Sequence, residues 1–257
     1  MLEALYFKGS SVLNFKFSVA QVASVKGDVD ENISTHLKAI EKASELGVSY
    51  IVFPELSLTG YEPEIAAQLA FSCDDKRLQP LIDSAIKNNI NIGVGAPLQS
   101  NGLPKIGLII ISQSGGVDTY EKMYLHSGEE AYFNKGKNHN LLTISSTKIA
   151  NAICADTNNG NHAHTCSELG AAVYVAGVLI TEAGYDSDTA VMAGYANKYN
   201  MLVAMANHNQ PTGNWAPIGK SAIWSNTGLL ACASENQNTL VVAEKLDNKW
   251  SGQVFEI

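Results

Sequence analysis

The sequence predicts a mixed α/β fold with at least one large sheet. Strand-length apolar runs alternate with helical patterns over the first two-thirds of the chain, hairpin-like strand pairs follow, and no linker-like or low-complexity stretch divides the 257 residues. Hydrophobic residues make up 46% of the chain and charged residues 16%, a composition that can fill a sizeable core. Periodicity alone does not decide whether the strands form one sheet or two.

The N-terminal elements follow from their periodicity and stop signals. The alternating run 15–22 predicts a first strand. A helix is predicted over 30–47, where apolar residues recur on one face and Gly47 provides a stop. The β-rich run 48–53 is a second strand, which ends at Pro54.

The remaining elements repeat these two patterns to the end of the chain. Further helices are predicted over 76–89, 163–170 and 188–200. Further strands are predicted over 90–98, 105–117 with its turn, 117–125, 147–154, 171–180, 201–208, the hairpin 220–234 and 238–246.

Charge and composition exclude several classes of protein. The net charge is −8 and no cluster of five Lys or Arg occurs, so no nucleic-acid partner is expected. No apolar run reaches the roughly 18–20 residues of a membrane span, and the start lacks a signal peptide's apolar core. We interpret 1–13 as an N-terminal arm or cloning remnant and 14–257 as one domain. Four widely spaced cysteines predict free thiols in a cytoplasmic protein.

Three apolar runs end in a side chain that catalysis could use. Glu55 follows one strand, Lys122 lies in or at the end of another, and Cys154 ends a third. A thiol near neutral pH is mostly protonated and needs a base or a cation to become an effective nucleophile. Glu55 could be that base, and Lys122 could stabilise a thiolate or an oxyanion. Taken singly, each is more often an edge, surface or core residue.

The segments that carry these residues resemble those of the nitrilase superfamily, the carbon–nitrogen hydrolases. "VFPELSLTGY", "YEKMYLHSGEEAYFNKG" and "AICAD" occur in the family's order, and the similarity covers roughly residues 14–246. The resemblance implies Glu55 as general base, Lys122 as the triad lysine and Cys154 as nucleophile. It also implies a four-layer α-β-β-α sandwich, a homodimer or higher homo-oligomer, and no cofactor or metal.

Two further roles come from the same resemblance. The family often has a second active-site glutamate after the lysine, and we favour Glu130 over Glu129 because Glu130 stands three residues before an aromatic residue. The backbone N–H of Ala155 is expected to help bind the oxyanion. The implied reaction is thiol-dependent hydrolysis of a non-peptide C–N bond in a small molecule. An amide is favoured over a nitrile, and N-carbamoyl compounds stay open as substrates.

The loop after the cysteine departs from the family pattern. Many relatives carry Arg-Phe-Pro-Glu where this chain has Asn158, Asn159, Gly160 and Asn161. Asn158, Asn159 and His164 are therefore candidate substrate-binding residues, unless the asparagines only form a turn. They bring no fixed positive charge, so we expect neutral or polar amides to be preferred over substrates with a nearby carboxylate.

Two other functions stay open from the sequence. Cys154, His162, His164 and Cys166 lie close together in the chain and could bind zinc, although their spacing departs from the usual zinc patterns. The chain could also be a family member that binds a ligand without catalysis. Measurable turnover of any amide would distinguish an enzyme from a non-catalytic ligand-binding protein.

Overall fold

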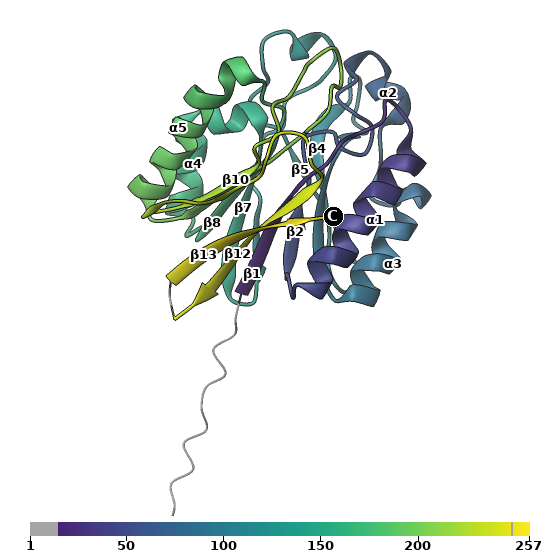
Figure 1. Cartoon of the computed structure of the whole chain (residues 1–257). Helices are drawn as coiled ribbons and strands as arrows, with labels where there is room; N and C mark the ends of the chain where they lie inside the picture. Colours follow the sequence, from purple (N-terminus) through teal and green to yellow (C-terminus); the bar gives the residue numbers. More distant parts are fainter. Residues whose placement is uncertain (1–14, 248) are drawn as a thin grey trace, which may run out of the picture.

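Two sheets stacked face to face form the centre of the computed structural model, which describes residues 15–247 and 249–257 (Figure 1). The predicted arm 1–13 lies outside the described residues. The first sheet holds, in spatial order, β13 (Lys249–Glu256), β12 (Thr239–Leu246), β1 (Phe15–Gln21), β2 (Tyr50–Val52), β3 (Asn91–Leu98), β4 (Lys105–Ile111) and β5 (Val117–Glu121). The second holds β11 (Gly228–Cys232), β10 (Ala222–Ser225), β9 (Leu202–Asn207), β8 (Val173–Val178), β7 (Thr147–Ile153) and β6 (Leu141–Ile144).

Helices cover the outer face of each sheet and complete a four-layer α-β-β-α sandwich (Figure 1). The α-helices are α1 (Val29–Glu45), α2 (Ala66–Leu69), α3 (Gln79–Asn88), α4 (Gly160–Glu168) and α5 (Glu182–Tyr199). Short 3₁₀ helices are η1 (Pro63–Ile65), η2 (Lys76–Leu78), η3 (Glu129–Ala131) and η4 (Cys154–Asn158). No helix in the described ranges combines the length and the apolarity that crossing a membrane requires.

Three apolar cores separate the four layers. One lies between the sheets and contains Val19 and Val52 of the first sheet and Val175 of the second. Another joins the first sheet to α1 and α3, and the third joins the second sheet to α4 and α5. Both the mixed α/β prediction and the layered fold implied by the resemblance are confirmed, and the strands form two sheets rather than one.

Most predicted elements occur near their expected bounds, and three features differ. Helix α5 begins at Glu182, six residues before the predicted start, because the turn-like sequence around Gly184 is helical here. The edge strands β6 and β13 were not predicted. Among the described residues each pairs with a single neighbouring strand, and its side chains are mostly exposed or half-buried. The sequence of β13 lacks the continuous apolar run by which buried strands are found, and β6 is only four residues long.

Candidate active site

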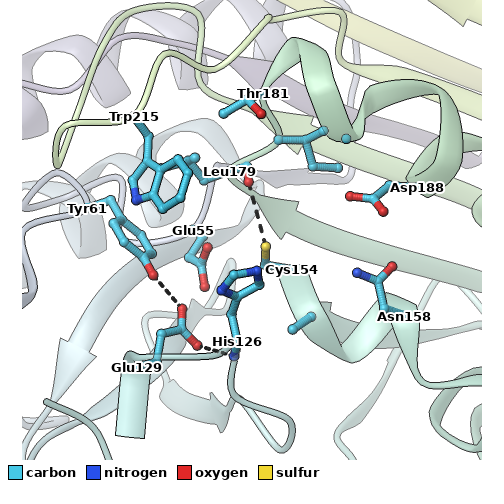
Figure 2. Close-up of a pocket in the computed structure, with 13 residues that line it drawn as sticks. Glu55, Tyr61, His126, Glu129, Cys154, Asn158, Leu179, Thr181, Asp188 and Trp215 are labelled. Carbon is cyan, nitrogen blue, oxygen red and sulfur yellow. Dashed lines mark hydrogen bonds between the residues drawn. The ribbon is translucent and has the colours of Figure 1, made fainter. Parts of the chain in front are cut away.

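The predicted Glu55, Lys122 and Cys154 come together where strands of the two sheets end. Glu55 follows β2 and Lys122 follows β5 in the first sheet, while Cys154 follows β7 in the second. Lys122 Nζ lies 2.7 Å from Glu55 Oε1, and both side chains are fully buried. Cys154 lines the same cavity as Glu55 (Figure 2).

Glu129, rather than Glu130, is the second glutamate at the lysine. Lys122 Nζ donates to both Glu129 oxygens at 2.8 Å. The Tyr61 hydroxyl and the His126 backbone N–H donate to the same carboxylate, each at 2.7 Å (Figure 2). Glu130, the residue favoured from the sequence, does not contact Lys122. Its exposed carboxylate accepts a hydrogen bond from the Gly128 N–H in the turn.

The local backbone explains which of the two adjacent glutamates faces inward. Gly128 has φ +95°, a conformation that glycine adopts at little cost, and it starts the single 3₁₀ turn η3. Glu129, the first residue of that turn, points toward Lys122, and Glu130 then points to solvent. The sequence motif carries no signal for this one-residue difference.

The two carboxylate oxygens of Glu55 differ in their hydrogen bonding. Oε1 accepts from Lys122, whereas the buried Oε2 has no hydrogen-bond partner within residues 15–247 and 249–257. Burial raises the Glu55 pKa to about 7; the Lys122 charge opposes this rise and the Glu129 charge adds to it. A carboxylate with a pKa near 7 can both accept and donate a proton at neutral pH.

Neighbouring backbone holds Glu55 in place from both sheets. A Cβ on Gly95 of β3 would lie 2.2 Å from Pro54 O, and one on Gly177 of β8 would lie 2.6 Å from Phe53 O. His208 Nε2 lies 2.8 Å from Glu55 O. Only glycine permits this close approach, so the segment that carries Glu55 is clamped between the two sheets.

The charge on Lys122 is held by its two carboxylate partners. Burial acts to lower the pKa of the lysine, but the negative charges of Glu55 and Glu129 outweigh it and raise that pKa above its ordinary value. Lys122 is therefore a fixed cation beside the Glu55 and Glu129 carboxylates.

Cys154 sits at a sharp turn with a left-handed backbone. Its φ is +44°, which is rare for a residue with a Cβ and is typical of strained functional positions. The thiol points to Leu179 O, with Sγ and O 3.8 Å apart (Figure 2). Burial raises the Cys154 pKa, the Glu55 charge raises it further, and the Lys122 charge opposes both. The resting residue is a neutral thiol beside a carboxyl group whose pKa of about 7 leaves it partly ionised at neutral pH.

Asp156 links the strand ends that carry Lys122 and Cys154. Its buried carboxylate accepts from the backbone N–H groups of Ile153, Met123 and Tyr124 at 2.9–3.0 Å. The Tyr120 hydroxyl also donates to it, at 2.6 Å. The sequence analysis assigned no role to Asp156; in the structure its carboxylate ties the end of β5 in the first sheet to the end of β7 in the second.

The cavity above Cys154 has a volume of about 270 Å³, enough for a small ligand. Ala155 and Asn158 line it, as the sequence analysis expected. The lining residues are Glu55, Tyr61, His126, Glu129, Cys154, Ala155, Asn158, Leu179, Ile180, Thr181, Gly184, Asp188 and Trp215 (Figure 2). Tyr61, His126, Asp188 and Trp215 were not predicted; Tyr61 and His126 lie in the quoted motifs but were given no role, and nothing in the local sequence distinguishes Asp188 and Trp215.

Asn159 and His164 do not line this cavity, which corrects their assignment as substrate-binding residues. The Asn159 side chain caps α4 by accepting from Asn161 N at 3.0 Å. The His164 side chain is 52% exposed and lies 3.4 Å from Glu168 on the outside of the same helix. Asn159 is polar because it caps the start of α4, and His164 is polar because it lies on the exposed face of that helix.

The four zinc ligands considered from the sequence are not brought together. Cys154 lines the cavity and His164 faces solvent. His162 and Cys166 instead cluster with His139, their ligand atoms within 4.8 Å of one another. Both ring nitrogens of His162 already face hydroxyls, Tyr120 at 2.9 Å and Tyr174 at 3.0 Å, and burial lowers its pKa to about 3. This geometry makes His162 a neutral, hydrogen-bonded core residue.

Comparisons with known proteins agree with this arrangement. The family model described as "Carbon-nitrogen hydrolase" matches residues 16–249. A glutamine-dependent NAD(+) synthetase of Aquifex aeolicus is 30% identical over 146 residues, which cover 54% of this chain and 25% of that protein. The Thermotoga maritima protein of the same name is 25% identical over 214 residues, 77% of this chain and 36% of that one. The chain thus spans about a quarter to a third of these relatives.

Solved structures match the chain almost completely. The NitN amidase from Nesterenkonia sp. AN1 superposes with a TM-score of 0.84 at 21% identity and covers 91% of this chain and 93% of its own. A mutant of that amidase in complex with butyramide superposes with a TM-score of 0.83 at 20% identity, covering 91% and 92%. At this identity the match shows a shared fold.

Proposed function

The chain belongs to the carbon–nitrogen hydrolase family, also called the nitrilase superfamily, and from this premise we propose that it hydrolyses the amide bond of a small molecule through a thioester on Cys154. The observation that carries the proposal is the free, buried Oε2 of Glu55 beside a neutral thiol. A base with a pKa of about 7 can take the thiol proton as the sulfur attacks.

The first half-reaction forms the acyl-enzyme. Cys154 Sγ attacks the amide carbon as Glu55 Oε2 accepts the thiol proton, and the carbonyl electrons move to oxygen. The Lys122 charge and the Ala155 N–H stabilise that oxyanion. The C–N bond then breaks, Glu55 returns its proton to the leaving nitrogen, and ammonia or an amine departs.

The second half-reaction releases the acid. Glu55 removes a proton from water, and the hydroxide oxygen attacks the thioester carbon. The tetrahedral intermediate collapses with cleavage of the C–S bond, and the proton on Glu55 returns to the sulfur. Glu129 takes no proton in this scheme; it holds Lys122 in position through its two bonds to Nζ.

Similarity to proteins named glutamine-dependent supports the side-chain amide of glutamine as a second candidate substrate. A homo-oligomer and a cytoplasmic location stay predictions from the sequence, and light scattering of the purified protein tests the first.

Ammonia release from a panel of amides, including butyramide and glutamine, tests the proposal. The wild-type protein should release ammonia from at least one amide, and Cys154→Ala should release none above background. A Cys154→Ala protein with full activity, or a panel on which both proteins are inert, would contradict it.

A further inference from the structure

The charges around the cavity are unevenly distributed. Glu55 and Glu129 both contact Lys122, so that cluster contains one cation between two carboxylates. Asp188 adds a third carboxylate away from this cluster, and the lining residues found in the described part of the chain include His126 but no arginine or lysine. The cavity is therefore acidic overall and suited to a substrate with positive charge.

Asp188 is placed so that a ligand in the cavity can reach it. It belongs to α5, lies half-buried, and directs its carboxylate into the cavity on the Asn158 side (Figure 2). An added Cβ at Gly184, one helical turn earlier, would lie 3.4 Å from Asp188 Oδ2. Asp188 Oδ2 therefore faces a residue without a side chain.

No cation of the described chain pairs with Asp188. The ion pairs among residues 15–247 and 249–257 do not include it. Burial raises the Asp188 pKa above its ordinary value. A hydrogen bond to Ser187 and the charge of His126 act in the opposite direction but do not cancel this rise. The carboxylate therefore bears a desolvation cost that a bound cation would offset.

We propose that Asp188 binds a protonated amino group at the distal end of the substrate, so that the substrates are small amides that carry an amine. The inference rests on the proposed amide hydrolysis. A chain must connect an amide carbon at Cys154 to an ammonium at Asp188, and the apolar part of the cavity wall includes Leu179 and Ile180. An aliphatic spacer suits that wall.

The test compares three amides by ammonia release. These are 5-aminopentanamide, its neutral counterpart hexanamide with the same number of non-hydrogen atoms, and the monoamide of glutaric acid. A partly exposed charge pair should favour the amine over hexanamide by about tenfold in kcat/KM. Asp188→Asn should remove this preference and Asp188→Lys should favour the acid. The matched control Asp186→Asn changes an exposed acid on the same helix outside the cavity lining and should keep the wild-type order.

A binding measurement separates this inference from the proposed reaction. In a Cys154→Ala background, calorimetry should show 5-aminopentanamide binding about tenfold more tightly than hexanamide, and Asp188→Asn should abolish the difference. Retained amine selectivity without wild-type turnover would support the subsite and contradict the hydrolase. Equal affinity for both amides, or selectivity that survives Asp188→Asn, would overturn the inference.

Discussion

Replacing Gly177 with alanine should impair catalysis from outside the cavity. The new Cβ would lie 2.6 Å from Phe53 O, 3.0 Å from Glu55 N and 3.1 Å from Pro54 C. Ordinary contacts of a Cβ begin near 3.4 Å, so the strand end that carries Glu55 must move by about 0.8 Å. A displacement of about 1 Å at a reacting group can cost about a hundredfold in rate.

The same substitution also has a predictable cost in stability. Overpacking a filled interior destabilises by about 1–3 kcal/mol, which lowers the Tm of a chain this long by about 2–10 °C. Because Gly177 does not line the cavity, kcat should fall about 10- to 100-fold while KM changes little. The assay is ammonia release at saturating substrate, with Tm measured by calorimetry on the same sample.

Gly194→Ala provides the matched control. Gly194 lies inside α5, and an added Cβ would meet nothing within 4 Å. Alanine there should leave kcat unchanged and stabilise the helix by up to about 1 kcal/mol. A Gly177→Ala protein with wild-type kcat would refute the argument that close backbone packing positions Glu55.

Other predictions follow from the site itself. Cys154→Ala should reduce kcat by at least about a thousandfold, whereas Cys73→Ala, Cys166→Ala and Cys232→Ala should not; an active Cys154→Ala protein would refute this assignment. Because the Glu129 charge raises the Glu55 pKa, Glu129→Gln should move the acid limb of the kcat/KM profile below pH 7, whereas Glu130→Gln should leave it in place; equal profiles would contradict the assignment of Glu129. Treatment with EDTA should change neither activity nor Tm, and a loss of both together with zinc would favour a metal site.

The sequence predicted the fold where burial produces continuous apolar runs. The strands that meet in the core, such as β3 and β8, lie near their predicted positions because both faces are covered. The edge strand β13 pairs only with β12, and its exposed side chains carry no comparable pattern. Edge strands are defined by a neighbour that sequence periodicity does not reveal.

The candidate active site also contains some residues that the sequence identified and others that only the tertiary structure shows. Glu55, Lys122 and Cys154 each follow a strand, and the three motifs that carry them occur in the family's order, so the resemblance could assign them. The choice between Glu129 and Glu130 depends on the direction of one turn, and the role of Asp188 depends on how α5 packs over the cavity. Both are consequences of tertiary structure.

The pairing of β1 with β12 sets the order in which the protein can be completed during synthesis. The antiparallel partner β12 is translated about 220 residues after β1, which at ribosomal speed takes roughly 10–40 s. During that interval one edge of β1 lacks its partner, and unpaired strand edges promote association with other chains. The nascent chain should therefore depend on a chaperone or on rapid synthesis, and truncations that remove β12 should aggregate rather than fold into a smaller protein.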